Sequence, residues 1–350
     1  MSTSIFEELT KHTKQTIDTM EEEDSQYFKN VYGVEFLNAT SNQGIVFNNW
    51  VKHPAVLVQA ADLVKTKFAK EGKTVPTSST DATFDEFIDE MFFYGIAITG
   101  KNQLKNIHGK VLSQVRTTLI YDTDGIVDYG KRIIAAYEEV GVDRTKVIVK
   151  IPVTWEAMQA VPILKKENIS CLGTVVQTLE QAVIAAEAGC VAISPYVDEF
   201  KYNLDPASYV KEDLSKNYGY VETVKIHKYY KAYGIKCNIC IASMIGINTM
   251  LYMSGIDEMT TPILTIHKCL TTPVPKDFKF PYLKHEYTAA EAGPKLAFFN
   301  EKKEHYYDTL NKNTVGTDRI NFACKFFEDM HGKSALLMKN TLLEHDYIKN

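Results

Sequence analysis

The sequence predicts an α/β protein built as a (β/α)8 TIM barrel, with additional N- and C-terminal helices. The chain has 350 residues, of which 45% are hydrophobic and 24% are charged, as is typical of a folded globular protein. Short apolar segments alternate with longer amphipathic ones through the middle of the chain. Since a single α/β barrel commonly reaches this size, we expect one barrel domain over 1–350, with a helical extension over about 285–350.

The alternating segments can be assigned in order along the chain. Runs rich in β-branched residues predict strands over 111–118, 147–151, 169–176, 191–196, 235–242 and 258–261. Apolar residues at helical spacing predict helices over 127–140, 154–167, 179–188, 221–233 and 248–254. Thr154 suits the N-cap of its helix, and glycines end three others. Repeated strand–helix units favour a parallel sheet with helices outside it, and many such units favour a closed barrel.

The segments after the last strand predict two further helices, over 287–300 and 318–343, with charged faces. These helices are suited to cover the side of the barrel or a neighbouring subunit, so a homodimer is the assembly we consider. Six cysteines are too few for a disulfide scaffold. Cys237 and Cys240 have the spacing of a metal motif, but they lie in a predicted strand, where their side chains point to opposite faces. We therefore expect no metal.

Charge and hydropathy exclude several classes of function. The formal charge is -5, which gives no reason to expect nucleic acid or an anionic membrane as a partner. The chain has no run of 18 or more apolar residues, and its N-terminus is polar rather than a signal peptide. We expect a cytoplasmic protein that acts on a small molecule.

Lys150 is the most informative residue of the sequence, because it interrupts an otherwise apolar strand, Val147-Ile-Val-Lys-Ile. Burial of an ammonium group is costly, so the pKa of this lysine should fall. A lysine with a lowered pKa is a nucleophile that forms a Schiff base with a carbonyl compound. The competing interpretation is a lysine near a strand end that extends to water, since Pro152 follows two residues later.

Other polar residues fall at the predicted strand ends, where the active site of a barrel of this kind lies. These residues are Gln114, Thr174, Ser194, Tyr196 and Ser243. Each alone is unremarkable. Together around one lysine, they could hold a water and a substrate carbonyl in place for proton transfer.

The segment 146–197 resembles the transaldolase family, a class I Schiff-base aldolase family with a (β/α)8 barrel. The resemblance rests on Val149-Lys150-Ile151-Pro152 with Thr154-Trp155-Glu156, then on the strand containing Thr174 and on Ser194-Pro195-Tyr196. The segment Asn38-Ala-Thr-Ser-Asn42 is similar to a further family segment. The resemblance extends from about residue 6 to residue 343.

The resemblance implies a role for several residues. Lys150 would form the imine, and Asn42 would hydrogen-bond substrate hydroxyls. Asp18 is the best match for the carboxylate that moves the proton in C–C cleavage, and Glu35 is the competing candidate. Thr174 would hold the catalytic water, and Ser194 would line the site. No cofactor is implied, because Schiff-base chemistry needs none.

Departures from the family pattern affect both the water and the phosphate. The family's acid/base glutamate is Gln114 here, which can orient a water but cannot take its proton. Together with Tyr196 in place of the usual phenylalanine, this resembles the fructose 6-phosphate aldolase branch. The asparagine expected before Thr174 is Leu172. The two phosphate-binding arginines of the family are matched by Glu199 and by Ile245, with Ser243 beside them. We therefore expect weak or no activity on sugar phosphates, and Glu199 could meet an amine on the substrate instead.

Three functions follow from these observations. The first is a transaldolase-like enzyme that makes or breaks a C–C bond in a non-phosphorylated or atypical carbonyl substrate. The second is an ordinary pentose-phosphate transaldolase, which converts sedoheptulose 7-phosphate and glyceraldehyde 3-phosphate to erythrose 4-phosphate and fructose 6-phosphate. The third is a non-catalytic paralogue that serves as a binding or scaffold protein.

Overall fold

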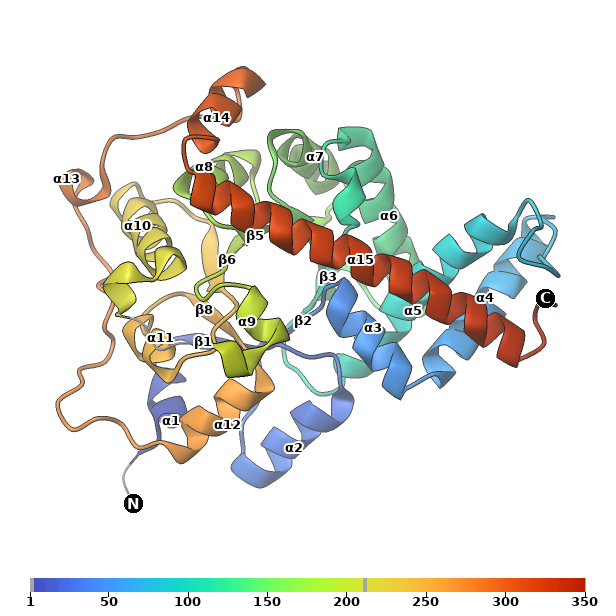
Figure 1. The fold of residues 1–350 in the computed structure, drawn as a ribbon, viewed down its shortest axis with the longest axis horizontal. Helices are drawn as coiled ribbons and strands as arrows, with labels where there is room; N and C mark the ends of the chain where they lie inside the picture. Colours follow the sequence, from blue (N-terminus) through green and yellow to red (C-terminus); the bar gives the residue numbers. More distant parts are fainter. Residues whose placement is uncertain (1–2, 210–212, 350) are drawn as a thin grey trace.

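Eight parallel strands form a closed barrel in the computed structural model, which describes residues 3–209 and 213–349 (Figure 1). Each strand pairs with its neighbours in chain order, and β8 closes the ring against β1. The strands are β1 (Lys14–Ile17), β2 (Asn38–Thr40), β3 (Val111–Gln114), β4 (Val147–Pro152), β5 (Ser170–Val176), β6 (Ala192–Pro195), β7 (Asn238–Ile241) and β8 (Glu258–Thr261). The predicted TIM barrel is confirmed.

Helices surround the barrel and connect its strands (Figure 1). Up to β6 they are α1 (Ile5–Leu9), α2 (Glu22–Tyr32), α3 (Gln43–Lys52), α4 (Ala55–Lys70), α5 (Phe84–Gln103), α6 (Thr123–Glu139), α7 (Trp155–Lys166) and α8 (Leu179–Ala188). Beyond β6 they are α9 (Lys201–Leu204), α10 (Tyr218–Ala232), α11 (Ile247–Tyr252), α12 (Ile263–Thr271), α13 (Ala289–Ala292), α14 (Lys303–Leu310) and α15 (Thr314–Glu344). Short 3-10 turns lie at Thr117–Leu119, Arg144–Lys146, Pro206–Ser208 and Leu214–Lys216.

Helix ends form where the sequence carries the expected residues. The Thr154 side chain accepts a hydrogen bond from the Ala157 backbone N–H and caps α7. Gly189 ends α8 with φ of 96°, a left-handed conformation that favours glycine. The helix predicted over 287–300 is wrong in extent, because α13 stops at Ala292. Gly293 follows it with φ of 81°, and Pro294 has no backbone N–H with which to continue a helix.

The interior of the barrel is apolar on one side and polar on the other. Leu112, Ile148, Leu172 and Ala192, on β3 to β6, form a small buried cluster. Across from them, Glu258 of β8 accepts hydrogen bonds from the Thr16 hydroxyl and, over 2.7 Å, from the Asn38 side chain. These partners satisfy a carboxylate that is only 7% exposed.

Two features of β7 and of the last helix complete the architecture. Cys240 contacts Thr260 inside the barrel, whereas Cys237 lies against Tyr230 of α10, so the two thiols do point to opposite faces. The long helix α15 runs across one end of the barrel (Figure 1) and packs against α3, α5 and β5. In the described part of the chain, no helix combines the length and the apolar character needed to cross a membrane.

Candidate active site

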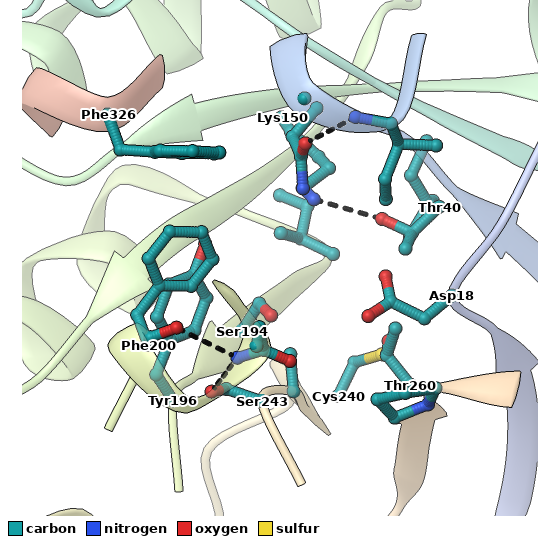
Figure 2. Close-up of a pocket in the computed structure, with 18 of the residues that line it drawn as sticks. Asp18, Thr40, Lys150, Ser194, Tyr196, Phe200, Cys240, Ser243, Thr260 and Phe326 are labelled. Carbon is teal, nitrogen blue, oxygen red and sulfur yellow. Dashed lines mark hydrogen bonds between the residues drawn. The ribbon is translucent and has the colours of Figure 1, made fainter. Parts of the chain in front are cut away.

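A cavity of about 250 Å³ lies at the C-terminal ends of the strands, where a barrel of this kind carries its active site. Lys150, Asp18, Asn42, Ser194, Tyr196 and Ser243, predicted from the sequence, all line it. Figure 2 shows the Lys150 amine and the Asp18 carboxylate on the same side of this cavity, with Phe200 and Phe326 on another side. Three other predicted residues, Gln114, Thr174 and Glu199, do not line it.

Lys150 lies inside the barrel, and its side chain is nearly inaccessible at 5% exposure. Its amine donates a hydrogen bond to the Thr40 hydroxyl over 2.9 Å (Figure 2). It donates a second one to the Ser41 carbonyl oxygen over 3.0 Å. Burial lowers the pKa of Lys150 to about 8, although the Asp18 carboxylate acts in the opposite direction. At pH 7 about a tenth of the amine is then neutral, far more than for an exposed lysine. The interpretation of a lysine extended into bulk water is excluded.

Asp18 follows β1 directly and shares the cavity with Lys150. Burial raises the pKa of this carboxyl group to about 6, while the Lys150 amine lowers it. A carboxylate with this pKa can both accept and release a proton near neutral pH. The alternative residue, Glu35, is exposed and pairs with Lys29 over 2.7 Å and with His108 over 2.6 Å, outside the cavity lining. Geometry therefore favours Asp18.

Gln114 of β3 and Thr174 of β5 do not line the cavity, but they lie on the two strands that flank β4, which carries Lys150. Gln114 pairs with Lys150 in register on the neighbouring strand, and its amide donates to Gln43 over 2.7 Å. Its Oε1 is buried and has no hydrogen-bond partner among the described residues. The Thr174 hydroxyl is close enough to lessen the rise in the pKa of Tyr196 that burial causes, yet no described group forms a hydrogen bond of normal geometry with it. These two groups are suited to hold a water.

Asn42, Ser194 and Ser243 each line the cavity from a different element. Asn42 caps α3, because its Oδ1 accepts a hydrogen bond from the Ile45 N–H over 3.0 Å, which leaves its amide N–H groups for a ligand. The Ser243 hydroxyl accepts from Asn203 over 2.6 Å. Ser243 also has φ of 57°, an uncommon conformation for serine, in the loop after β7.

The loop after β7 is held in place by the carboxylate of Asp198, which was not identified from the sequence. Asp198, which follows β6, accepts hydrogen bonds from the Ile245 N–H over 2.7 Å and from the Gly246 N–H over 3.2 Å. The Asn217 side chain donates to its other oxygen over 2.9 Å. Burial raises the pKa of Asp198, and these hydrogen bonds lower it. Asp198 therefore fixes the two strand ends that carry Ser194 and Ser243.

Glu199, expected from the sequence to bind substrate, does not line the Lys150 cavity. Its side chain forms an ion pair with Lys201 over 2.8 Å and lines a separate hollow. Ile245 is buried and contributes its backbone N–H to Asp198 instead of lining the cavity. Leu172, by contrast, does line the cavity. Among the lining residues that the structure describes, Lys150 is the only one with a cationic side chain.

Several lining residues were not identified from the sequence. Thr40 belongs to the Asn38–Asn42 segment that resembles the family, and its place in that segment, two residues before Asn42, was the available signal. Cys240 and Thr260 face the cavity from β7 and β8. Phe326 comes from α15, which is far away in the sequence, and nothing in its local pattern indicates a cavity (Figure 2). It packs against Phe200 with ring centres 5.3 Å apart.

Residues of metal-ligand type gather elsewhere. Within the described ranges, the grouping of this kind is Glu21, Glu23 and His53, near the ends of α2 and α3. His53 Nε2 lies 2.8 Å from a Glu21 oxygen, and the Lys52 amine lies 3.8 Å from that same oxygen. A cation so close already compensates this carboxylate, and none of these residues lines the Lys150 cavity.

Most of this chain is similar in sequence to known proteins. Residues 16–326 fit the family model described as Transaldolase/Fructose-6-phosphate aldolase. A protein named transaldolase from Saccharomyces cerevisiae is 29% identical over 266 residues, which are 74% of this chain and 73% of that protein. A probable transaldolase from Dictyostelium discoideum is 31% identical over 260 residues, 73% of this chain and 75% of that protein. A transaldolase from Prochlorococcus marinus is 28% identical over 249 residues, 70% of each chain.

Proposed function

Because the chain belongs to the transaldolase/fructose-6-phosphate aldolase family, which comprises class I aldolase-type transferases, we propose that it is a transaldolase that reacts through Lys150. In this proposal a ketose forms an imine with Lys150, loses an aldehyde, and leaves a ketol unit that a second aldehyde accepts. The observation that carries the proposal is a buried lysine, with its pKa lowered to about 8, that shares a cavity with a carboxylate.

Imine formation begins with the neutral amine of Lys150. Its nitrogen attacks the ketone carbon, and one N–H proton moves to the carbonyl oxygen to give a neutral carbinolamine. The hydroxyl group then takes up a second proton, supplied by the solvent, and leaves as water, while the nitrogen lone pair forms the C=N bond of a protonated imine. We assign the movement of this water to the Gln114 amide and to the hydroxyls of Thr174 and Tyr196. Support comes from the buried Gln114 Oε1 and Thr174 Oγ1, which form no hydrogen bond of normal geometry with the described residues and lie on the strands that flank β4.

Cleavage of the C–C bond is assigned to Asp18. Its carboxylate takes the proton from the substrate hydroxyl, the C–C bond breaks, and an aldehyde leaves. The bonding electrons move to the protonated imine and give a neutral enamine on Lys150. Attack of this enamine on a second aldehyde, with return of the Asp18 proton, runs the same step in reverse. The pKa of about 6 suits Asp18 to both directions.

The first candidates for the substrates are the sugar phosphates of an ordinary pentose-phosphate transaldolase, sedoheptulose 7-phosphate and glyceraldehyde 3-phosphate. The relatives named transaldolase favour it over the atypical substrate that the sequence suggested, since they cover about three quarters of the chain. The second candidate is the same chemistry on an unphosphorylated carbonyl compound. It is favoured by the cavity lining, in which Lys150 is the only cation among the described residues. We expect catalysis in the cytosol on a small sugar-like molecule, and a homodimer remains the assembly to examine.

Two measurements test this proposal. Borohydride reduction in the presence of a ketose should attach the ketose irreversibly to Lys150, and mass mapping of the peptide should locate it there. A coupled assay with fructose 6-phosphate and erythrose 4-phosphate, run beside fructose or dihydroxyacetone with uncharged aldehydes, separates the two substrate candidates. If no ketone in a broad panel gives an adduct, the enzymatic proposal fails and the non-catalytic paralogue takes its place.

A further inference from the structure

One side of the Lys150 cavity is built from aromatic side chains. Tyr196, Phe200 and Phe326 line it, and we call these three residues the aromatic wall. The Phe200 ring stacks on the Tyr196 ring, with centres 5.6 Å apart, and meets the Phe326 ring at 63°, with centres 5.3 Å apart. Phe200 and Phe326 are each half-buried and keep part of their surface accessible. Figure 2 shows the aromatic wall across the cavity from Asp18.

The aromatic wall is held in place by its neighbours. Phe327 is fully buried and packs against Phe200, with ring centres 5.3 Å apart, and against Phe326, with ring centres 5.6 Å apart. A Cβ on Gly44 would come within 3.1 Å of Phe326 Cε1, so this ring also lies close against the start of α3. Both rings are therefore fixed before a substrate enters, and they can bind an apolar group with little loss of side-chain freedom.

Two further apolar residues border the cavity beside the aromatic wall. They are Ile45, at the start of α3, and Leu204, at the end of α9, which is exposed. Asn203 lies next to Leu204, but its amide N–H groups already donate to the Ser243 hydroxyl over 2.6 Å and to the Phe200 carbonyl oxygen over 3.3 Å. Sugar hydroxyls placed against these side chains would lose hydrogen bonds to water and gain few in return, which is costly.

The polar groups Lys150, Asp18, Thr40 and Asn42 line the same cavity and are suited to hold the reacting ketol unit. The barrel interior beneath them is filled by the apolar cluster on β3 to β6. An acceptor aldehyde that reaches the enamine on Lys150 must therefore extend outward, toward the end of the barrel that α15 crosses (Figure 1). This is the end from which α15 supplies Phe326 to the lining, so the far part of the acceptor meets the aromatic wall.

We propose that the aromatic wall binds the apolar chain or ring of an acceptor aldehyde, so that the ketol unit on Lys150 is transferred to a hydrophobic aldehyde. The inference rests on the proposed function and makes its second substrate candidate specific. Phe200 and Phe326 can contact an aromatic substituent edge-to-face or offset-stacked, and an aliphatic one through their accessible faces.

The transfer step uses the groups already assigned to the reaction. The enamine carbon on Lys150 forms a C–C bond with the aldehyde carbon, and the aldehyde oxygen takes the proton held by Asp18. The nitrogen lone pair restores the C=N bond of the protonated imine. Water then adds to the imine carbon, the ketone product leaves, and the Lys150 amine is freed with return of one proton to the solvent.

The test uses fructose as donor and compares phenylacetaldehyde with erythrose as acceptor. Transfer to phenylacetaldehyde releases glyceraldehyde and gives 1,3,4-trihydroxy-5-phenylpentan-2-one, which chromatography and mass spectrometry identify. We expect kcat/KM of the wild type to be about 10-fold higher for phenylacetaldehyde than for erythrose. Phe326→Ala should lower this ratio about 10-fold, and Phe326→Leu should lower it less, because leucine keeps an apolar surface. Phe322→Ala is the matched control, since Phe322 lies one turn earlier on α15, is exposed and does not line the Lys150 cavity.

A preference for phenylacetaldehyde that falls in Phe326→Ala and persists in Phe322→Ala supports the proposal. A wild-type preference for erythrose, an unchanged ratio in Phe326→Ala, or an equal fall in both variants overturns it. If neither acceptor reacts, saturation-transfer NMR with 2-phenylethanol decides instead. Binding that Phe326→Ala weakens and Phe322→Ala retains supports the proposal, and absence of binding to the wild type overturns it. Failure of Lys150 to form an adduct with any ketone would defeat the proposed function, which borohydride trapping measures separately.

Discussion

The Lys150 amine reaches across the barrel interior to the Thr40 hydroxyl, to which it donates a hydrogen bond over 2.9 Å. These residues lie on β4 and β2, with β3 between them. The hydrogen bond directs the amine toward the side of the barrel where β1 ends, and therefore toward Asp18 (Figure 2). The two groups shift each other's pKa, as expected for charges that share a cavity shielded from water.

Lys150→Met should abolish the borohydride-trapped adduct and at the same time stabilise the fold. The folded pKa of about 8 lies below the ordinary value of 10.5, so the folded state binds the proton less tightly than the unfolded state. The cost of this burial is fully present below pH 8 and disappears as the pH rises toward 10.5. We expect a gain on the order of 3 kcal/mol at pH 7 that shrinks by pH 10. Chemical denaturation at both pH values measures it, and Lys146→Met, at an exposed lysine before β4, is the control. An equal gain at both values would contradict this account.

Asp18→Asn should separate the two halves of the reaction. The amide cannot accept the hydroxyl proton, so C–C cleavage should slow by about 100- to 10,000-fold, whereas the imine on Lys150 should still be trapped. The rate of aldehyde release and the yield of reduced adduct are the two measurements. Glu35→Gln is the matched control, because Glu35 is exposed and pairs with Lys29 and His108. Loss of cleavage in Glu35→Gln, with Asp18→Asn active, would reverse the assignment.

The reaction should depend on pH through both groups. Imine formation needs the neutral amine, so its rate should rise with pH and level off above about 8. Cleavage needs the Asp18 carboxylate, so it should fall as the pH drops below about 6. Single-turnover measurements from pH 5 to 10 would resolve the two steps. A rate of adduct formation that keeps rising up to pH 10 would show that the amine has the pKa of an ordinary exposed lysine.

Asp198→Asn should loosen the loop that carries Ser243. An amide cannot accept at both positions that now receive N–H groups, so one buried N–H would lose its partner. We expect a loss of about 1 to 3 kcal/mol in the free energy of unfolding, with a higher KM and little change in the trapped Lys150 adduct. Asp205→Asn, at an exposed aspartate just after α9, should change neither. An unchanged KM in a destabilised Asp198→Asn protein would limit Asp198 to a structural role.

Much of the candidate site could be predicted because its residues occupy strand ends. Lys150 and Ser194 lie within strands whose apolar pattern was readable, and Tyr196 follows β6 directly. Asp18 depended on a resemblance, since β1 is only four residues long and has no distinct pattern. Gln114 and Thr174 were placed on the right strands, but neither lines the cavity, because spacing along a strand does not specify which side chains reach it.

The sequence by itself determined the barrel, the lysine within it and the class of chemistry, because each of these depends on local periods of apolar residues or on a short motif. Only the tertiary structure decided that Glu199 lies outside the cavity lining and that Phe326, from α15, belongs to it. The physical reason is that α15 crosses the barrel more than a hundred residues after the strands it covers (Figure 1). Which side chains meet there depends on how the whole barrel closes, and no local stretch of residues carries that information.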